Sequence, residues 1–423
     1  MTSYFDALET RETAVREAAL LAALPVQVAH AQAHATAFAE IFRGVDARAI
    51  TSREALATLP VTRKHELLAA QLAAREAGGD AFGGFSALRF GARMPRVFAS
   101  PGTIYEPDST RRDYWRMARA MFAAGFRPGE LIHNSFSYHF VPAGAMMESG
   151  AHALGCTVFP GGTGQTEQQV RAMAELQPSG YIGTPGFLKI IVEKALELGM
   201  ALPSVTKALV SGEAFPPSLQ RWLGERGIAG FQCYASADLG LIAYETEARE
   251  GLVLDEGVIV EIVQPGTGDP VAIGEVGELV VTTLNPDYPL IRFGTGDLSA
   301  LLPGHCPTGR TNARIRGWMG RADQTVKVRG MFVHPSQIAS IARRFPEVVK
   351  ARLVVTGEMA DDRMTLMVET GLTPADAGTL ENLGQRISDA IRDITKLRGT
   401  VQCVAHGALP NDGKVIEDAR SYQ

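Results

Sequence analysis

The sequence predicts a mixed α/β protein with a large N-terminal α/β domain, which includes a β subdomain, and a small α+β C-terminal domain. From Pro95 onward, strand-like and helix-like segments alternate, which is typical of a largely parallel α/β sheet. Near Gly251 the chain becomes β-rich, with Pro and Gly turns. After Asp323 a compact tail mixes short strands with a long helix. We therefore expect an N-terminal domain over residues 1–322, its β subdomain near 251–318, and a C-terminal domain over 323–423.

The chain is expected to begin with helices. Ala14–Ala33 is rich in Ala, Leu, Glu and Arg, which favour helix. Ser52 is a plausible cap for a further short helix. Helical composition resumes over Arg63–Glu76, after the break at Leu59-Pro60-Val61-Thr62.

Short apolar strands and longer helices follow one another in the expected α/β core. The strands are predicted at Val97–Ser100, Leu131–Ser135, Cys156–Pro160, Gly180–Gly183 and Ala208–Val210. The helices are predicted at Arg111–Ala124, Ala143–Ala153, Gln165–Leu176, Phe187–Leu198 and Ser218–Arg226. The β subdomain is expected to use Val258–Val263, Gly277–Thr283 and Leu290–Phe293. The tail is expected to use Val326–Val328, Ser336–Arg344, Lys350–Val355, Arg363–Glu369 and Asp376–Leu397.

Composition narrows the class of protein. Of the 423 residues, 46% are hydrophobic and 21% charged, as in a globular protein that buries a sizeable core. The net charge of −5 argues against a nucleic-acid partner. No apolar stretch approaches the ~20 residues that a membrane span needs, so no membrane partner is expected. The N-terminus lacks the pattern of a secretion signal. The four cysteines are far apart, which favours a reduced cytoplasmic enzyme.

Five widely spaced motifs carry the functional prediction. They are Ser211-Gly212-Glu213-Ala214, Tyr234-Ala235-Ser236-Ala237-Asp238, Pro289 to Asp297, Gly320 to Gly330 continuing to His334-Pro335, and Leu409 to Lys414. In this order they resemble the adenylate-forming superfamily. More narrowly, Leu59 to Arg63, Phe136 to Pro160 and Gly183-Thr184-Pro185 are similar to the phenylacetate–coenzyme A ligase branch.

The resemblance implies a reaction in two steps. ATP would activate a carboxylic acid as an acyl-adenylate, and the acyl group would pass to coenzyme A, with Mg²⁺ as cofactor. Two alternatives remain open, an adenylating enzyme that serves a carrier protein or an amine, and a non-catalytic relative. The expected partner is a small carboxylic acid, and a homodimer is left open.

The resemblance also assigns residues to the nucleotide. Tyr234 would stack on adenine, and Asp238 would replace the usual Glu that holds magnesium, since Asp is also a hard oxygen ligand. Asp297 would bind the ribose, because one carboxylate offers two acceptor oxygens. From the residues alone, a turn-capping Asp and a buried strand-end Tyr are the alternatives. Gly212, Glu213, Ala214, Ala235, Ser236 and Arg321 complete this part of the expected site.

The expected phosphate loop departs from the pattern of the superfamily. Ser100, Gly102 and Thr103 are present, but Tyr105 stands in place of a glycine and Glu106 in place of the lysine. A negative charge there would weaken ATP binding unless it points away or helps to hold metal. This departure motivates the non-catalytic alternative.

Lys414 is the expected catalytic residue. A flexible ammonium that bridges acyl oxygen and α-phosphate would offset the repulsion between two anions. The alternative from the residues alone is a solvated surface lysine. By resemblance, the C-terminal domain is mobile and acts as a lid. Its expected hinge is Asp323, and it presents the Gly330 region to the coenzyme A thiol.

The acyl pocket is expected along Phe136–Met147, with Tyr138, His139, Phe140, Ala143 and Met146 as candidates. Aromatic and Met side chains suit a flat apolar acid. Plain hydrophobic core is an equally good interpretation. Phe187 and Phe215 are weaker candidates, and a substituted aromatic acid is the expected substrate.

The resemblance to the branch also raises a structural zinc, which many close relatives hold. Here Cys306 and His305 alone are too few for a closed tetrahedral site, because Thr308, Tyr244 and Val253 stand at the other ligand positions. We therefore expect no zinc.

Overall fold

The computed structural model describes residues 3–100, 103–322, 326–328, 331–357, 362–371 and 377–420. The chain forms two compact units. Unit 1 comprises Met1–Val260, Val281–Gly294 and Leu302–Trp318, and unit 2 comprises Glu261–Val280, Thr295–Leu301 and Met319–Gln423. The expected α/β class is confirmed. The domain limits at residues 322 and 323 stay predictions.

The core of unit 1 is a nine-stranded sheet with the order β14-β15-β10-β9-β8-β7-β6-β4-β5. Strands β5, β4, β6, β7 and β8 are parallel neighbours, and β8, β9, β10 and β15 continue antiparallel. The strands are β4 (Leu131–Asn134), β5 (Thr157–Pro160), β6 (Gly180–Gly183), β7 (Lys207–Val210), β8 (Ala229–Ser236), β9 (Gly240–Glu245), β10 (Leu252–Leu254), β14 (Leu301–Leu302) and β15 (Arg314–Ile315).

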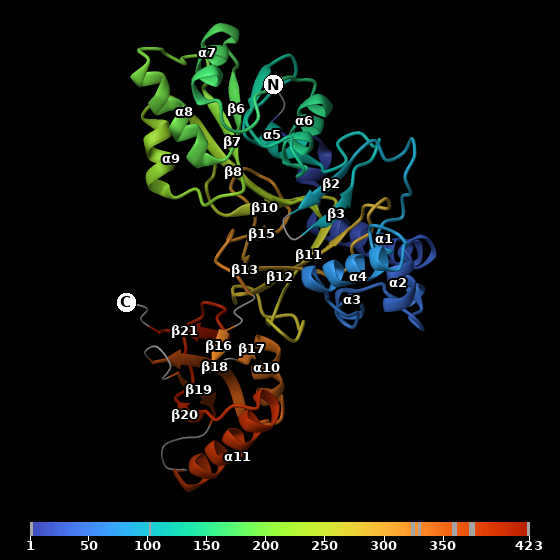
Figure 1. Ribbon diagram of the computed structural model, residues 1–423, viewed down its shortest axis with the longest axis vertical. Helices are drawn as coiled ribbons and strands as arrows, with labels where there is room; N and C mark the ends of the chain where they lie inside the picture. Colours follow the sequence, from blue (N-terminus) through green and yellow to red (C-terminus); the bar gives the residue numbers. More distant parts are fainter. Residues whose placement is uncertain are drawn as a thin grey trace. The chain divides into compact units, whose positions relative to one another are not determined.

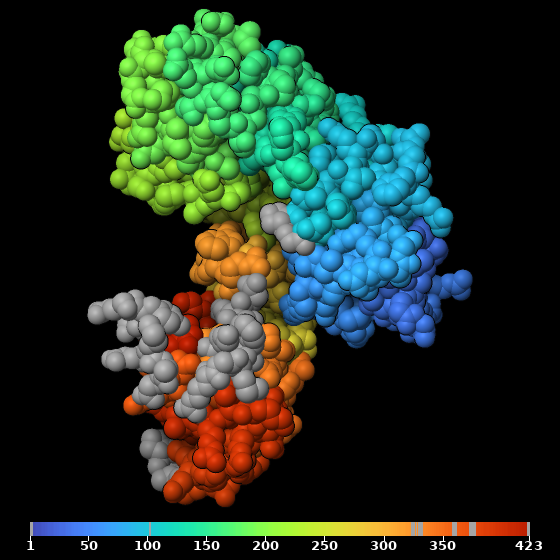
Figure 2. Space-filling model, in the orientation of Figure 1, coloured from blue at the N-terminus to red at the C-terminus, as the bar shows by residue number. Residues whose placement is uncertain are grey.

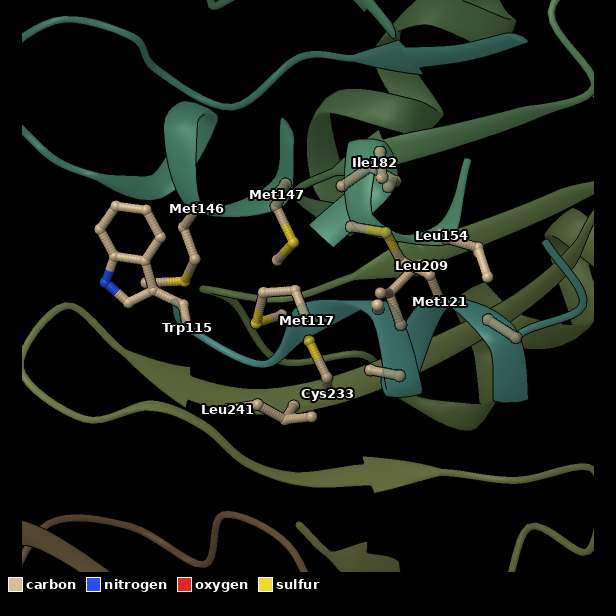
Figure 3. Packing of buried hydrophobic residues seen from close by; sticks show 14 of the residues in the cluster. Trp115, Met117, Met121, Met146, Met147, Leu154, Ile182, Leu209, Cys233 and Leu241 are labelled. Carbon is tan, nitrogen blue, oxygen red and sulfur yellow. The ribbon is translucent and has the colours of Figure 1, made fainter. Parts of the chain in front are cut away.

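Helices cover both faces of this sheet because side chains alternate along each strand. On β6, Tyr181 packs into one hydrophobic cluster with α7, α8 and α9, whereas Ile182 packs into another with α5 and α6. Helices α7 to α9 lie together along β6, β7 and β8 (Figure 1). Figure 3 shows the second cluster, where methionines of α5 and α6 meet Ile182 and Leu209. The helices are α5 (Met117–Ala123), α6 (Ala143–Leu154), α7 (Thr166–Leu176), α8 (Pro185–Glu197) and α9 (Pro217–Gly224).

The N-terminal part is helical, as predicted. Its elements are η1 (Ala7–Thr10), α1 (Thr13–His34), α2 (Thr36–Ile41), η2 (Ala47–Ala49), α3 (Arg53–Ala57), strand β1 (Thr62–Arg63) and α4 (Lys64–Glu76). Ser52 caps α3, since its side chain accepts a hydrogen bond from the Ala55 amide. These helices, coloured blue in Figure 2, adjoin the cyan residues that follow them, and the Ala37 amide bonds the Gly84 carbonyl at 3.0 Å.

Helix α5 is shorter than predicted. We expected a helix over Arg111–Ala124, but α5 begins only at Met117. The preceding Arg116 is left-handed, with φ 63°. Its guanidinium binds Asp255 at 2.7 Å and the carbonyl of Leu239 at 2.6 Å. These tertiary bonds turn the backbone away from the helical path that composition favoured.

A further four-stranded sheet has the order β1-β13-β12-β11. The predicted strand Leu290–Phe293 is wrong, because β13 begins at Phe293. Arg292, just before it, has φ 47°, and its buried guanidinium binds the carbonyls of Ala57 and Leu59. The turn that delivers this side chain prevents an earlier strand. The bounds are β11 (Val258–Val263), β12 (Gly277–Thr283) and β13 (Phe293–Ser299).

The C-terminal part of unit 2 contains a sheet with the order β20-β19-β18-β21. Apolar residues of α10 and α11 pack with those of β18 and β19 in one cluster. The predicted helices and strands of the tail are confirmed with small shifts of their ends, whereas β17, β20 and β21 were not predicted. The elements are β16 (Val326–Val328), β17 (Met331–Val333), α10 (Pro335–Arg343), β18 (Val348–Thr356), β19 (Arg363–Thr370), α11 (Ala377–Thr395), β20 (Thr400–Val404) and β21 (Ile416–Asp418).

None of the described helices combines the length and the apolar character that crossing a membrane requires.

Candidate active site

The carboxyl ends of β6, β7 and β8 lie side by side in unit 1. Gly183 of β6 pairs with Val210 of β7, which pairs with Gln232 of β8. The segments that leave these strands are therefore neighbours, and they include the motifs 211–214 and 234–238. In open α/β sheets, ligands bind at this edge of the sheet.

The segment after β7 is fixed on both sides. Ser211 Oγ donates to the Cys233 carbonyl at 2.9 Å, and Glu213 Oε2 accepts from the Gly186 amide at 3.1 Å. Between them, Gly212 has φ +80°, which other residues rarely adopt. A Cβ there would lie 3.8 Å from the side chains of Phe136 and Thr184, an ordinary contact distance, so these side chains do not crowd the backbone. Ala214 follows Glu213 and ends this segment.

A β-bulge shapes the end of β8. The register between β8 and β9 shifts between Tyr234, which faces Ala243, and Ala235, which faces Leu241. Bulges re-aim side chains and are frequent beside active sites. Ser236 Oγ accepts from the Leu239 amide at 3.2 Å and closes the turn that carries Asp238.

Asp238 is buried beside a lysine from a distant helix. Its side chain is only 1% exposed, and its Oδ2 lies 2.9 Å from Nζ of Lys64, the first residue of α4. Its Oδ1 is buried and has no hydrogen-bond partner among the described residues. A carboxylate oxygen of this kind fits Mg²⁺, which favours hard oxygen ligands. Asp238 would hold the ion, which would neutralise phosphate charge.

The predicted phosphate loop is the turn of a β-hairpin between β2 (Val97–Ser100) and β3 (Ile104–Pro107). Gly102 lies outside the described residues. Thr103 is exposed and left-handed, with φ 63°. Ser100 is buried, and its Oγ donates to Glu106 Oε1 at 2.6 Å.

Tyr105 fastens this hairpin to α4. The Gln71 side chain bonds both its carbonyl, at 2.9 Å, and its amide, at 2.8 Å. The Arg75 guanidinium stacks over its ring at 5.0 Å. The backbone and the ring of Tyr105 therefore help to hold the hairpin against α4, which explains a tyrosine in place of a glycine.

Glu106 points into the protein. It is 1% exposed, and burial followed by the charge of Asp238 raises its pKa from 4.5 to about 8. Ser100 and Lys64 act in the opposite direction. At neutral pH Glu106 is therefore mostly a neutral acid, so the negative charge that the sequence suggested is largely absent.

Asp297 and Arg321 form an ion pair in unit 2. Arg321 Nη1 lies 3.0 Å from Asp297 Oδ1, and the two residues form an isolated antiparallel bridge. Gly296 has φ +72°, and a Cβ there would lie 2.7 Å from Arg321 Nη2. Asp297 lies within β13, and the pair remains partly exposed.

Lys414 lies exposed on a loop of unit 2 that a buried arginine holds. Arg352 on β18 is 3% exposed and donates to the Pro410 carbonyl at 3.2 Å. It also pairs with Asp412, whose Oδ1 accepts the Lys414 amide at 3.1 Å, and with Glu417 at 3.2 Å.

The start of this loop is fixed as well. Buried Glu369 accepts from the amides of Gly407 and Leu409 at 3.1 and 2.6 Å. At the tip, a Cβ on Gly413 would lie 2.6 Å from Val276 and 3.2 Å from Leu298, the neighbour of Asp297. The Lys414 loop therefore packs beside the strand that carries Asp297. Asp323 and Gly330, the expected hinge and coenzyme A side, lie outside the described residues.

The five acyl-pocket candidates have different environments. Tyr138 Oη accepts from Asn134 Nδ2 and donates to Glu148, both at 2.8 Å, and burial followed by Glu148 raises its pKa. His139 and Phe140 are exposed, the latter to 82%. Met146 is buried beside Trp115 in the hydrophobic cluster, with Ala143 at its edge (Figure 3). Phe187 and Phe215 pack in the cluster of α7 to α9.

A buried polar group at the same sheet edge was missed. His133 of β4 stacks on Phe159 and Tyr181, and its Nε2 lies 2.7 Å from Gln169 Oε1. Burial lowers its pKa, so it is neutral at neutral pH. Ser135 Oγ donates to Tyr181 Oη at 2.5 Å. The signal available in the sequence was that His133 and Ser135 lie near the end of a predicted strand.

Around Cys306 the polar partners are hydroxyls. Its Sγ lies 3.3 Å from Thr246 Oγ1 and 3.1 Å from Thr308 Oγ1. Tyr244 donates to Glu9 at 3.3 Å. Within the described parts of the chain, no group of three or more His, Cys, Asp or Glu side chains is arranged to hold a metal ion.

Comparison with known families gives two matches along the chain. Residues 111–285 match the family of AMP-binding enzymes. Residues 330–418 match the family described as the C-terminal domain of AMP-binding enzymes.

Individual proteins extend this likeness. The chain is 32% identical to phenylacetate–coenzyme A ligase of Thermus thermophilus, over 77% of this chain and 74% of that one. It is 30% identical to the Aromatoleum evansii enzyme of the same name, over 68% of each chain. Among solved structures, 2-hydroxyisobutyryl-CoA ligase with 2-HIB-AMP and CoA superposes with a TM-score of 0.72 at 23% identity, covering 97% of this chain and 92% of that one. This last likeness concerns the fold.

Proposed function

Because this chain belongs to the phenylacetate–coenzyme A ligase family of AMP-binding enzymes, we propose that it couples a carboxylic acid to coenzyme A at the expense of ATP. In the first step the carboxylate oxygen attacks the α-phosphorus and pyrophosphate leaves. In the second step the coenzyme A thiol attacks the acyl carbon, AMP leaves with the bonding electrons, and the thiol loses its proton.

One observation carries the nucleotide part of this proposal. The ends of β7 and β8 are adjacent, so the uncrowded backbone at Gly212 and the bulged segment from Tyr234 to Ser236 are neighbours in unit 1. These two segments would hold adenine, which offers two flat faces and polar edges. Asp238 adds a carboxylate oxygen for Mg²⁺ where the phosphates would follow.

In unit 2, Asp297 and Arg321 would bind ribose, and Lys414 would serve adenylation. The Lys414 ammonium offsets the repulsion between the attacking carboxylate and the α-phosphate. Support comes from its exposed side chain on a loop whose backbone Arg352 holds. Asp323 as hinge and Gly330 on the coenzyme A side remain part of the same proposal.

The substrate is an aromatic acid in this proposal. The relatives named above act, by name, on phenylacetate. The uncharged, aromatic sheet edge formed by His133, Phe159 and Tyr181 is compatible with an apolar ring. A homodimer, a carrier-protein acceptor and a cytoplasmic location stay predictions.

The neutral state of Glu106 argues against a non-catalytic relative. The sequence motivated that alternative by a negative charge in the phosphate loop. Burial, followed by the charge of Asp238, raises the pKa of Glu106 to about 8 and so removes most of that charge at neutral pH.

Acid-dependent exchange of labelled pyrophosphate into ATP tests the first step. We expect phenylacetate and substituted aromatic acids to drive exchange, and the product with coenzyme A to have the mass of the thioester. Exchange with no acid in a broad panel would end the proposal. Exchange without a coenzyme A product, but with acylation of a carrier protein or an amine, would favour the alternative acceptor.

A further inference from the structure

The hairpin between β2 and β3 carries no cation at the position where the superfamily resemblance predicts a lysine. Glu106 occupies that position, and its carboxyl is turned inward to Ser100. ATP has charge to neutralise at its β- and γ-phosphates. If the proposed function holds, a cation must come from another element.

Lys64 is a cation at this location. It begins α4, directly after β1, and its Nζ lies 2.9 Å from Asp238 Oδ2. Its side chain is 40% exposed, whereas that of Asp238 is 1% exposed. The half-exposed side chain of Lys64 thus contacts a buried carboxylate. Its positive charge also acts on Glu106, whose pKa it lowers.

Several buried polar atoms around Lys64 lack partners. Asp238 Oδ1, Glu106 Oε2, Thr62 Oγ1 and Tyr288 Oη are buried and have no hydrogen-bond partner within the described chain. Tyr288 is near both acids, because after burial their charges are the next causes that raise its pKa. Buried polar groups are nearly always hydrogen-bonded, so such a group of exceptions points to a ligand, ion or water that completes it.

We propose that Lys64 supplies the cation for the terminal phosphates of ATP that the hairpin lacks. This inference rests on the proposed function and adds a binding residue to it. An ammonium has three donors, and the bond to Asp238 uses one of them. Glu106 has its own hydrogen bond, from Ser100, and the ammonium of Lys64 bonds Asp238.

The site would bind a triphosphate or pyrophosphate and would contribute little to the binding of AMP. Lysine binds phosphate as a point charge on a flexible stem, so it tolerates movement of the phosphates during the reaction. Lys64 would recognise the polyphosphate and not the adenine. Comparing ligands with and without a polyphosphate therefore tests the inference separately from the adenine site.

The test compares ATP and AMP binding to the full-length protein by calorimetry. For Lys64→Ala we expect ATP to bind at least about tenfold more weakly, consistent with the loss of one charge-assisted contact, while AMP changes less than about twofold. Lys64→Arg should keep most of the ATP affinity. Lys64→Ala with Glu106→Lys should recover part of it, since the cation returns on the hairpin.

Lys207→Ala is a matched control. Lys207 pairs with Glu130 at 2.6 Å at the start of β7, the opposite end of that strand from the proposed site. It should lower the melting temperature to a similar extent while leaving ATP affinity unchanged.

Two results would overturn the inference: unchanged ATP affinity in Lys64→Ala, or equal loss for ATP and AMP in a folded variant. The second would make Lys64 only a structural partner of Asp238. Failure of the proposed function looks different. The wild type would then bind ATP, with the Lys64 dependence intact, but no acid would drive pyrophosphate exchange.

Discussion

The Lys414 loop in unit 2 and the β2–β3 hairpin in unit 1 each carry a charged residue expected near phosphate, but they hold it in opposite ways. Lys414 is exposed, and buried Arg352 and Glu369 hold the backbone around it. Glu106 is itself buried and hydrogen-bonded. Lys414 is thus an exposed charge on an ordered backbone, whereas burial raises the pKa of Glu106 and removes most of its charge at neutral pH.

Substituting Lys414 should produce the largest effect. For Lys414→Ala we expect adenylation to fall by about 10²–10³-fold, the usual loss on removing one donor from a developing charge. The thioester step should be unaffected, and the melting temperature unchanged because the side chain is exposed. Pyrophosphate exchange and single turnover from preformed acyl-adenylate measure the two steps. The exposed Lys396 provides the control, and normal exchange in Lys414→Ala would refute the assigned role.

The next effect separates the lysine from its support. Arg352→Gln should lower adenylation by about 10-fold to 100-fold and stability by about 1.5–3 kcal/mol, because it removes hydrogen bonds to charged groups. Thermal melting and pyrophosphate exchange give both numbers. Arg420→Gln breaks the ion pair with Asp362 instead, and should lower stability without a selective loss of adenylation. Equal exchange rates in the two variants would contradict a positioning role.

A smaller change probes the tip of the loop. Gly413 has φ +69° and packs against Val276, so Gly413→Ala meets both backbone strain and a clash. We expect the loop conformation that places Lys414 to lose about 1 kcal/mol of stability, which corresponds to an about fivefold lower rate of adenylation. Gly407→Ala has a similar φ of +80° but no atom within 4 Å of its Cβ, and separates strain from packing. Exchange rates that match between these variants would show that the contact with Val276 is unimportant.

The smallest catalytic effect is expected at Glu106, where the readout is pH. Its pKa in the folded protein, about 8, lies above the ordinary 4.5. Below pH 4.5 this group costs no stability. As the pH rises toward 8, the unfolded chain releases the proton more readily, so unfolding becomes easier by up to ~1.4 kcal/mol per pH unit.

Glu106→Gln should remove that loss while changing exchange at pH 7 by less than about threefold. Urea unfolding between pH 5 and 8.5 measures it, with exposed Glu247→Gln as control. Parallel stability curves for wild type and Glu106→Gln would show that the carboxyl is ionised throughout.

The same contrast explains how far the sequence could be interpreted. Helix α1 was predicted from composition, because local propensity and its tertiary environment agree. Helix α5 was predicted too long, because bonds from Arg116 to Asp255 and Leu239 outweigh local propensity. Propensity is a weak guide wherever a buried ion pair decides the backbone.

For the site, motif spacing predicted Lys414 and the segments beside β7 and β8. It did not find Lys64, although that residue directly follows the motif from Leu59 to Arg63. Its partner Asp238 is 174 residues away, so their pairing is a property of the fold. Arg352 was predicted only as part of a strand, since nothing local links it to Pro410 or Asp412.

The double hydrogen bond between Gln71 and Tyr105 has a mechanical consequence. It ties α4 to β3, so the helix that begins with Lys64 and the strand that carries Glu106 move as one piece. A ligand that binds the ammonium of Lys64 therefore also restrains the hairpin. Slower amide hydrogen exchange along β2 and β3 on addition of ATP would then report that the helix terminus is engaged.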